Sequence, residues 1–316
     1  MTPGKLLVHV DVDSPAKLLD FYQIRGVDLE TADIEEFHQA AWPRALEFFD
    51  DLGVEATFFV VADELEQNLA IQGLVRSAHE AGHEIENHTY SHPFGLAGLS
   101  REQVVDEIAK CNSIVQDITG RRPVGFRSPG YSMNAALLDL LEEQGMRYDS
   151  SAFWSVLNVM ARLRPSLLSR SAQAGRELGD VTRELGASPY MPDRTHWSTP
   201  GSEPRSLWEL PLPRLAGIPF YNTFNLWAPR PYTQLAARLV NRPFLVYLFH
   251  LIEFVDLSDR SVPDELKVHP NVSTPVATKL GRTRQTMTAL LRRLEPDRTA
   301  DFVEALAGAP RLPSFR

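Results

Sequence analysis

The chain has 316 residues, of which 43% are hydrophobic and 23% charged, so it can form one large α/β domain or two smaller ones. Its formal net charge of −9 argues against non-specific binding to nucleic acid, which needs a basic surface. The single cysteine, Cys111, excludes an internal disulfide and any zinc site built from cysteines.

Short apolar strands alternate with amphipathic helices through the first 150 residues. Strands are predicted at 6–10, 56–61, 83–87 and 124–127 and from 148 onward, and helices at 34–52, 63–81, 101–119 and 135–145. Ser100 stands before the third helix as its cap, with Gln103 at the capping-box position. This alternation predicts parallel strands with helices outside them, as an open sheet or a barrel.

The alternation stops after Trp154. Residues 156–206 read as an insertion that holds one helical stretch and a long loop rich in Pro, Ser and Arg. Further elements are predicted at 207–212, 233–240, 244–251 and 276–294, followed by a Pro-rich tail. No internal repeat or linker is visible, so we expect a single domain over 1–316 with an insertion at about 156–206.

Two signals bear on location. The N-terminus carries no basic stretch followed by an apolar one, as a signal peptide does. The longest apolar run, 244–255, is interrupted by His250 and Glu253 and is shorter than the about 20 residues of a membrane-spanning helix. We therefore expect a cytoplasmic protein.

Charged and titratable residues gather where the predicted strands end. Active residues of parallel α/β proteins lie at those ends, whereas strands that only pack should end in turn residues. Five strands end in seven such side chains, which are Asp11, Asp13, His88, His92, Arg127, Asp149 and His250.

Asp13, His88 and His92 form a set of one carboxylate and two imidazoles. The two histidines are four residues apart, a spacing that on one helical turn lets both rings converge on one ion. Three protein ligands leave positions open for water, as in a catalytic metal site. Such an ion would lower the pKa of its water and polarise a carbonyl oxygen.

The remaining residues suit acid–base chemistry around that ion. Asp11 could take a proton from water, and a histidine on the opposite side could protonate a leaving amine. Arg127 could hold the base ionised and oriented. After Pro129, the backbone N–H of Gly130 or Tyr131 could donate to a tetrahedral oxyanion.

With these residues in view, the chain resembles the polysaccharide deacetylases, the NodB-type family related to family 4 carbohydrate esterases. The resemblance covers 5–155 and 207–294 and runs in order through five motifs. They are the aspartate motif at 9–15, His-Thr-Tyr-Ser-His at 88–92, Arg-Ser-Pro-Gly-Tyr at 127–131, Asp149 to Trp154, and Leu-Phe-His at 248–250.

The resemblance implies a distorted (β/α)7 barrel. Asp13, His88 and His92 would bind zinc or a similar divalent ion such as Co²⁺, Mn²⁺ or Ni²⁺. It also implies that Arg127 pairs with the base, that Tyr131 supplies the oxyanion N–H, and that Pro129 belongs to the same motif. His250 would be the general acid, assisted by Asp149, and Trp154 would wall the pocket.

The first motif departs from the common family form, in which two aspartates are adjacent. Here Val12 separates Asp11 from Asp13. Side chains alternate along a strand, so Asp11 and Asp13 share a face and Asp11 is favoured as the base. The Asp-Val-Asp form is similar to a subgroup acting on lipid-linked amino sugars, including a deformylase, and also to relatives acting on other small amides.

Two basic segments stand out on this acidic chain. Residues 156–176 contain four Arg and no acid, and 278–294 contains Lys279, Arg282, Arg284, Arg292 and Arg293. Such segments can contact an anionic membrane surface, or they can simply be solvated helix faces.

The sequence thus predicts a metal-dependent hydrolase that removes an acetyl or formyl group from an amino sugar, in a cytoplasmic or lipid-linked glycan precursor. One alternative is hydrolysis of a non-sugar or cyclic amide at the same metal site. Another is a non-catalytic, sugar-binding barrel. The identity of the sugar, the metal and the oligomeric state are left open.

Overall fold

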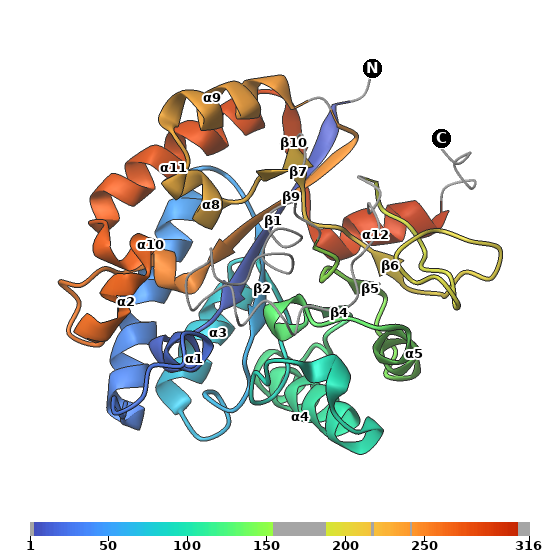
Figure 1. Ribbon diagram of the computed structural model, residues 1–316, viewed down its shortest axis with the longest axis horizontal. Coiled ribbons are helices and arrows are strands. Elements are labelled where there is room, and N and C mark those ends of the chain that lie inside the picture. Colours follow the sequence, from blue (N-terminus) through green and yellow to red (C-terminus); the bar gives the residue numbers. More distant parts are fainter. Residues whose placement is uncertain (1–2, 154–187, 216–217, 241, 309–316) are drawn as a thin grey trace, which may run out of the picture.

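A parallel sheet organises the protein, whose computed structural model describes residues 3–153, 188–215, 218–240 and 242–308. Seven strands follow one another in the order β9–β1–β2–β3–β4–β5–β6 and curl into a half-barrel (Figure 1). Their bounds are β1 Gly4–Val12, β2 Ala56–Val60, β3 Glu84–Asn87, β4 Gly125–Phe126, β5 Tyr148–Asp149, β6 Trp208–Glu209 and β9 Phe244–His250. An eighth strand, β10 (Leu294–Pro296), pairs with the start of β1. The predicted barrel-type α/β fold is confirmed.

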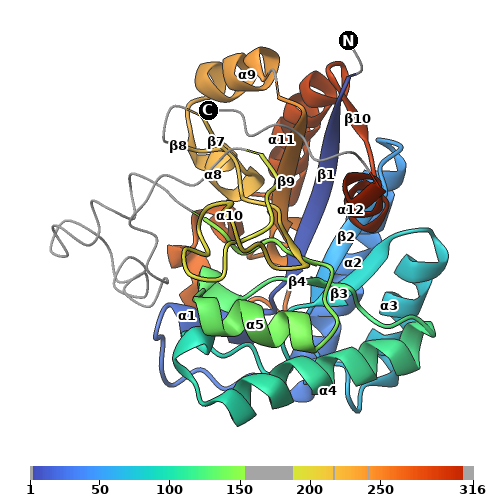
Figure 2. The same ribbon diagram turned by 90° about the vertical axis from the view of Figure 1, so that its right-hand side faces the viewer.

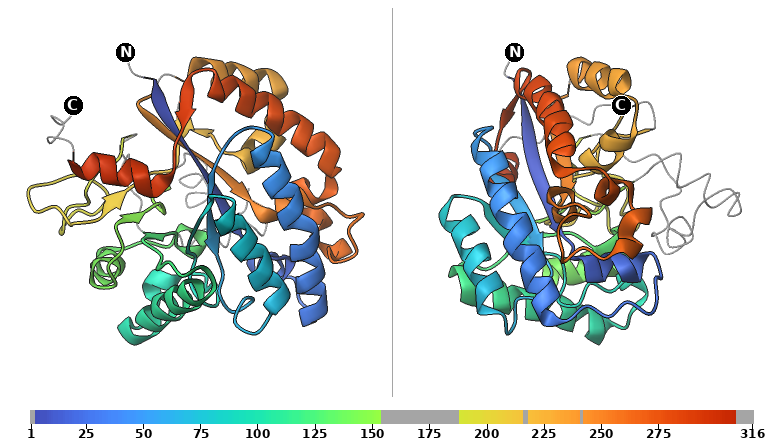
Figure 3. Two further views of the ribbon diagram at one scale, coloured as in Figure 1. Left: turned by 180° about the vertical axis from the view of Figure 1, so that it is seen from behind. Right: turned by 90° about the vertical axis from the view of Figure 1, so that its left-hand side faces the viewer.

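Helices cover the outside of the sheet. From behind, α2, α3 and α4 lie side by side across it, with α11 beyond α2 (Figure 3). The helices are α1 Pro15–Phe21, α2 Thr31–Asp50, α3 Leu69–Glu80, α4 Arg101–Thr119, α5 Ala135–Glu143, α8 Asn222–Trp227, α9 Arg230–Leu239, α10 Pro270–Ser273, α11 Val276–Leu291 and α12 Thr299–Gly308. Two-residue strands β7 (Arg214–Leu215) and β8 (Ile218–Pro219) form a separate antiparallel pair, and α9 and α4 lie at opposite ends of the molecule (Figure 2).

Alternation along β1 divides the core into two layers. Leu6, Val8, Val10 and Val12 belong to the cluster between the sheet and the outer helices. Leu7 belongs to a second cluster inside the half-barrel. Because side chains alternate along a strand, Asp11 shares the inner side with Leu7. Val12 is therefore part of the outer core.

Two expected helix boundaries were wrong, and so was the expectation for the region after the last of these helices. The helix expected over 63–81 begins only at Leu69, because Asn68 caps it by accepting hydrogen bonds from the N–H groups of Ala70 and Ile71. The final helix expected over 276–294 ends at Leu291. A Pro-rich tail was expected after this helix, but the strand β10 and the helix α12 follow it.

The helix α12 is attached to the inside of the half-barrel by polar contacts. Glu84 of β3 accepts hydrogen bonds from the N–H groups of Thr299 and Ala300, which begin α12. The Thr299 hydroxyl lies 2.7 Å from that of Thr57 and 3.0 Å from Nε2 of His9. A continuous polar contact thus joins α12 to the strands that carry the site.

The predicted insertion is described only from residue 188 onward. There the chain is a loop that touches β6 and itself through the isolated bridges Tyr190↔Glu209, Pro192↔Pro200 and Asp193↔Pro204. The helical stretch expected earlier in the insertion lies outside the described residues. Among the described helices, none combines the length and the apolar character needed to cross a membrane.

Candidate metal and catalytic site

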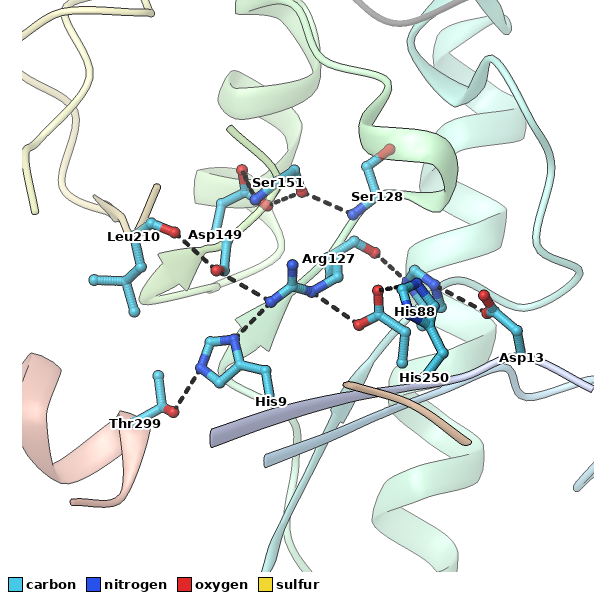
Figure 4. A network of polar contacts seen from close by, with 12 residues as sticks. His9, Asp13, His88, Arg127, Ser128, Asp149, Ser151, Leu210, His250 and Thr299 are labelled. Carbon is cyan, nitrogen blue, oxygen red and sulfur yellow. Dashed lines mark hydrogen bonds and ion pairs between the residues drawn. The ribbon is translucent and has the colours of Figure 1, made fainter. Parts of the chain in front are cut away.

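The sheet brings the predicted site residues together at the carboxyl ends of its strands. Asp11 is near the end of β1, and across the ladder it lies opposite His250, the last residue of β9. His88 follows β3, Arg127 follows β4, and Asp149 ends β5. Figure 4 shows the side chains of these strand ends close to one another, among them Asp13, His88, Arg127 and His250.

Asp13, His88 and His92 form the one group of potential metal ligands found among the described residues. Their ligand atoms lie within 4.8 Å of one another, and all three side chains are buried. Oδ1 of Asp13 is 3.4 Å from Nε2 of His88 and 3.2 Å from Nε2 of His92. The predicted ligand set is therefore assembled in space.

The two histidines do not lie on a helical turn, contrary to the expectation from their spacing. Residues 88–92 form a loop in which Thr89 and His92 have left-handed φ angles of 70° and 63°. The Oδ1 atom of Asn87 accepts from the N–H of Thr89, and the Thr89 hydroxyl oxygen accepts from the N–H of His92. These bonds hold a strained backbone that turns both rings toward Asp13.

Hydrogen bonding fixes which nitrogen of His88 faces the cluster. Nδ1 of His88 is 2.7 Å from the carbonyl oxygen of Arg127, which can only accept, so Nδ1 carries the proton. In the neutral ring, Nε2 then presents a lone pair to the carboxylate of Asp13. Nε2 is thus the nitrogen that could bind a metal ion together with the carboxylate, 3.4 Å away.

The charges around the cluster favour the ionised carboxylate of Asp13, which is the form that binds a metal ion. Burial alone would raise the pKa of Asp13, but His92 and His88 hold it well below its usual range. Burial lowers the pKa of His88, yet the neighbouring carboxylates of Asp13 and Asp11 outweigh burial and raise it. An anionic oxygen and two imidazole nitrogens suit a divalent ion such as zinc.

Asp11 and Arg127 form a buried ion pair beside that cluster. Oδ1 of Asp11 is 2.9 Å from Nε of Arg127, whose guanidinium is fully buried and lies over the ring of Phe59. A second nitrogen of Arg127 approaches Nδ1 of His9 at 2.6 Å and the hydroxyl of Ser150 at 3.2 Å. Arg127 is thereby held on several sides and fixes the carboxylate of Asp11.

His9 is neutral in this position. Burial and the adjacent Arg127 hold the pKa of its ring well below the usual range. Nδ1 therefore accepts from Arg127, and Nε2 donates to the Thr299 hydroxyl. The contact with Arg127 brings His9 next to the site.

His250 faces Asp11 across the cluster. Its Nε2 is 3.9 Å from Oδ2 of Asp11, and its side chain is 19% exposed. Its Nδ1 is 2.9 Å from the hydroxyl oxygen of Thr223. The predicted base and the predicted acid thus lie opposite one another, with the acid partly open to solvent.

Asp149 forms its hydrogen bonds with residues other than His250. Its carboxylate accepts from the hydroxyl and the N–H of Ser151 and is hydrogen-bonded to Glu209 of β6. Burial and the charge of Asp149 raise the pKa of Glu209 well above its usual range, so Glu209 carries the shared proton. In the described part of the chain, His250 contacts Thr223 and Asp11, and no contact with Asp149 supports the expected assistance.

The Arg-Ser-Pro-Gly-Tyr motif forms a tight turn at 129–131. The N–H of Tyr131, expected to serve an oxyanion, donates in this conformation to the carbonyl of Ser128. Gly130 has a φ of 59°, and a Cβ there would come within 3.2 Å of the Phe94 ring, so the turn requires glycine. Pro129 is buried at the start of this turn.

Aromatic rings line the turn. The ring of Tyr131 packs on Phe153 at 5.0 Å, and Phe153 meets Tyr221 edge-on at 5.9 Å. Trp154, predicted as a pocket wall, lies outside the described residues. Phe153, its neighbour in the chain, contributes to an aromatic wall that the sequence analysis did not predict.

Sequence reasoning also missed Thr223, Glu209 and Glu253. Glu209 had a visible signal, because a carboxylate inside a short apolar strand is unusual. Glu253 had one too, as an acid in the apolar run 244–255. Thr223 carries no such signal, since threonine is common on every kind of surface.

Comparison with known proteins supports this arrangement. Residues 31–149 match the family model described as polysaccharide deacetylase. The chain is 28% identical over 173 residues to the peptidoglycan deacetylase-like protein FGM2 of Gibberella zeae, covering 54% of this chain and 45% of that protein. It is also 28% identical over 145 residues to a peptidoglycan deacetylase of Helicobacter pylori, covering 45% of this chain and 47% of that protein. The chain thus spans less than half the length of these two relatives.

A solved structure shares the fold over the whole chain. It comes from Mycobacterium smegmatis and is described as a putative polysaccharide deacetylase. The two structures have a TM-score of 0.60 at 20% sequence identity, covering 100% of this chain and 96% of the other. At that identity the likeness concerns the fold.

Proposed function

We propose that the chain belongs to the polysaccharide deacetylase family, whose model matches residues 31–149, and that it is a metal-dependent hydrolase that removes an acetyl or formyl group from an amino sugar. The observation that carries the proposal is the buried cluster of Asp13, His88 and His92 beside an opposed carboxylate and imidazole. A metal cluster alone could be structural. The addition of a base and an acid 3.9 Å apart favours hydrolysis.

Asp13, His88 and His92 would hold the metal ion. A bound divalent ion supplies Lewis acidity, which makes water easier to deprotonate and an acyl carbonyl easier to attack. We propose zinc, because one carboxylate and two imidazoles with open positions form a common zinc donor set, and Co²⁺, Mn²⁺ and Ni²⁺ are the alternatives.

The chain's own residues would divide the proton transfers. Asp11 takes a proton from the water that adds to the acyl carbon. Arg127, fixed by His9 and Ser150, holds the carboxylate of Asp11 in place through their ion pair. His250 gives a proton to the leaving nitrogen, so that the C–N bond breaks to yield a carboxylate and a free amine.

The experiment offers the metal-loaded protein a panel of acetylated and formylated amino sugars, free, nucleotide-linked and lipid-linked, and follows mass by mass spectrometry. We expect loss of acetyl or formyl mass from at least one member. Turnover of cyclic or non-sugar amides alone would support the alternative substrate class. Sugar binding without any turnover would support the non-catalytic barrel.

The metal assignment has its own measurement. Zinc content determined by elemental analysis should be close to one ion per chain in the wild type and should fall in a His88→Ala/His92→Ala variant. A matched control, His79→Ala/His196→Ala, removes two histidines outside the cluster and should retain the ion.

A membrane-linked substrate is a finer proposal, and the structure changes which residues could support it. Lys279 is buried and donates to the carbonyls of Val255 and Asn271. Arg282 donates to the carbonyls of Asn225 and Ala228, and Arg284 pairs with Asp51. Three of the five cations of the basic segment 278–294 therefore bind other groups of the protein. The first basic segment, 156–176, lies outside the described residues.

We propose that an anionic membrane surface contacts the face between α9 and α11, which includes the two remaining cations of the segment 278–294, Arg292 and Arg293. A groove of about 970 Å³ there is lined by Arg238, Arg284, Arg292 and Arg293 and by no acidic residue. Beside it, Leu235 and Leu239 of α9 are 57% and 66% exposed. Exposed leucines next to arginines are typical of a surface that lies on anionic lipid.

Co-sedimentation with vesicles at low salt tests this contact. Vesicles of phosphatidylcholine with phosphatidylglycerol should bind the wild type, and pure phosphatidylcholine vesicles should not. An Arg292→Glu/Arg293→Glu variant should lose binding, whereas Arg121→Glu/Arg122→Glu, a pair after α4, should keep it. Equal binding by both variants would remove this face from consideration. The cytoplasmic location expected from the sequence stays a prediction.

A further inference from the structure

We propose that Thr223 and Glu253 are positioning residues that hold the ring of His250 in one tautomer, with its site-facing nitrogen free to take up and deliver a proton. The role of His250 as acid rests on the proposed function. The hydrogen-bond arrangement does not, and it can be tested by itself.

The hydroxyl of Thr223 links His250 to a buried carboxylate. Its oxygen lies 2.9 Å from Nδ1 of His250 and 2.5 Å from Oε1 of Glu253. A threonine hydroxyl has one proton to donate. If that proton goes to Glu253, the oxygen of Thr223 must accept the proton on Nδ1 of His250.

The surroundings of Glu253 settle the direction of this bond. Besides Thr223, the amide groups of Asn222 and Asn271 donate to its carboxylate, at 2.6 and 3.1 Å. Trp227 Nε1 is a donor only and lies 2.7 Å from Oδ1 of Asn271, which leaves the amide nitrogen of Asn271 for Glu253. Three donors surround one carboxylate, so Glu253 acts as acceptor throughout.

The neutral ring of His250 is therefore the Nδ1–H tautomer. Its Nε2 atom then carries a lone pair on the side of Asp11, 3.9 Å from Oδ2. Uptake of a second proton occurs at Nε2, and that proton faces the reacting groups. The carboxylate of Glu253, acting through Thr223, holds the ring in this orientation, as a buried carboxylate does for a catalytic histidine in a Ser-His-Asp triad.

The support for this arrangement comes from three separate elements. Thr223 is on α8, Glu253 is in the 3₁₀ turn Leu251–Phe254 directly after β9, and Asn271 is on α10. The side chains of Glu253 and Asn271 are almost fully buried, and Thr223 is 8% exposed. Buried donors and acceptors that satisfy one another keep a side chain in place before substrate binds.

Few charged groups compete for the ring of His250. Asp11 faces it from β1, and Glu253 acts on it through Thr223. His269, at the start of α10, is the other titratable neighbour. Burial and the proximity of His250 lower the pKa of His269 to about 3, so it stays neutral. Asp149, the partner expected from the sequence, is bonded to Ser151 and Glu209.

A pair of matched variants tests the proposal on the zinc-loaded full chain. Thr223→Val keeps the shape but removes the hydroxyl, and Thr223→Ser keeps the hydroxyl. In protein labelled with [15N]histidine, NMR of the ring nitrogens should show the Nδ1–H tautomer for His250 in the wild type and in Thr223→Ser. Thr223→Val and Glu253→Gln should shift the ring toward the Nε2–H tautomer.

The kinetic expectation follows from the same bonds. With an acylated amino sugar that the wild type turns over, Thr223→Val should lower kcat about 10-fold or more, with KM within twofold. Thr286→Val on α11, which removes a hydroxyl without contact to His250, should behave as wild type.

Two results would overturn the proposal. One is an Nε2–H tautomer of His250 in the wild type, and the other is an unchanged tautomer in both Thr223→Val and Glu253→Gln. If the wild type hydrolyses no acylated sugar, the proposed function fails, and the NMR comparison still decides whether Thr223 and Glu253 hold the ring. If Thr223→Val does not fold, Glu253→Gln provides the same NMR comparison.

Discussion

Asp11 and Asp13 are separated by one residue, yet their side chains have different surroundings. Asp13 meets two imidazoles, while Asp11 meets the guanidinium of Arg127 and the ring of His250. The intervening Val12 packs into the outer core and keeps both carboxylates on the inner side. The Asp-Val-Asp pattern is thus a strand pattern, and we propose that Asp13 binds the ion while Asp11 takes the proton.

Asp11→Asn should separate these two tasks. We expect kcat to fall by about 10²- to 10⁴-fold, since an amide cannot accept the proton of water. Zinc content should remain at the wild-type level, because Asp11 is not one of the clustered ligands. Elemental analysis and kinetics on the same preparation check both parts. Asp28→Asn, at an exposed position, serves as the control, and parallel loss of metal and activity in Asp11→Asn would contradict the division.

The site residues that could be predicted are those that stand out against their neighbours in the sequence. Asp13, His88 and His92 stand at strand ends, where polar residues are conspicuous. Thr223 could not be predicted, because its bond to His250 joins residues 27 positions apart and leaves no local pattern. The helical turn expected at 88–92 was wrong for a related reason, since the bonds from Asn87 and Thr89 that bend this loop are a matter of side-chain geometry.

At the scale of elements, α11 shows how a basic pattern can mislead. Lys279 looks like part of a charged helix face, but its side chain is buried and its ammonium group caps the carbonyls of Val255 and Asn271. Burial lowers the pKa of Lys279 to about 8. The helix is therefore attached to the 3₁₀ turn after β9 by a group that is costly to keep charged.

This burial predicts a pH dependence of stability. In the unfolded chain Lys279 titrates near its ordinary pKa of 10.5, above its folded value of about 8. Between these values the unfolded state binds more protons, so the free energy of unfolding should rise with pH, by up to about 1.4 kcal/mol per pH unit from this group. Below pH 8 the contribution of this group should be flat.

Denaturant unfolding of wild type and Lys279→Met between pH 7 and 10.5 measures the effect. The difference in the free energy of unfolding between the two proteins should grow over pH 8 to 10.5. Lys110→Met, at an exposed position on α4, should stay parallel to the wild type. A constant difference between Lys279→Met and wild type across this range would show that Lys279 titrates normally.

The strand–helix alternation predicted most of the sheet and its outer helices, because those elements are amphipathic over many residues. The structure also contains α1, α8 and α12, which the alternation did not predict. The last of these begins at Thr299, directly after β10, in a region whose prolines suggested a tail. Its anchoring by Glu84 of β3 is a contact over more than 200 residues, which periodicity does not reveal.

At the scale of the whole molecule, polar contacts run from the site through the inside of the half-barrel to α12. Arg127 donates to His9, and His9 to Thr299. Thr57 donates to Glu84, so the hydroxyl of Thr299 donates in turn to Thr57. Every donor in this chain points toward Glu84, which also caps α12.

Thr299→Val should break this chain at its middle. The ring of His9 and the hydroxyl of Thr57 would each lose a buried partner, which should lower the free energy of unfolding by about 1–3 kcal/mol. Thr299→Ser retains the hydroxyl and should lose much less. Denaturant unfolding at one pH compares the two variants with the wild type. Equal stability of the valine and serine variants would show that the hydroxyl is not needed.

The register between β1 and β9 has a practical consequence for engineering. Asp11 and His250 lie directly opposite each other on paired strands, so their separation is determined by the spacing of a parallel ladder, about 4.8 Å between strands. Loops that surround the site can be lengthened, shortened or exchanged without altering that spacing. A library that varies only those loops would therefore change which molecules enter the site while the proposed proton-transfer pair, Asp11 and His250, keeps its backbone spacing.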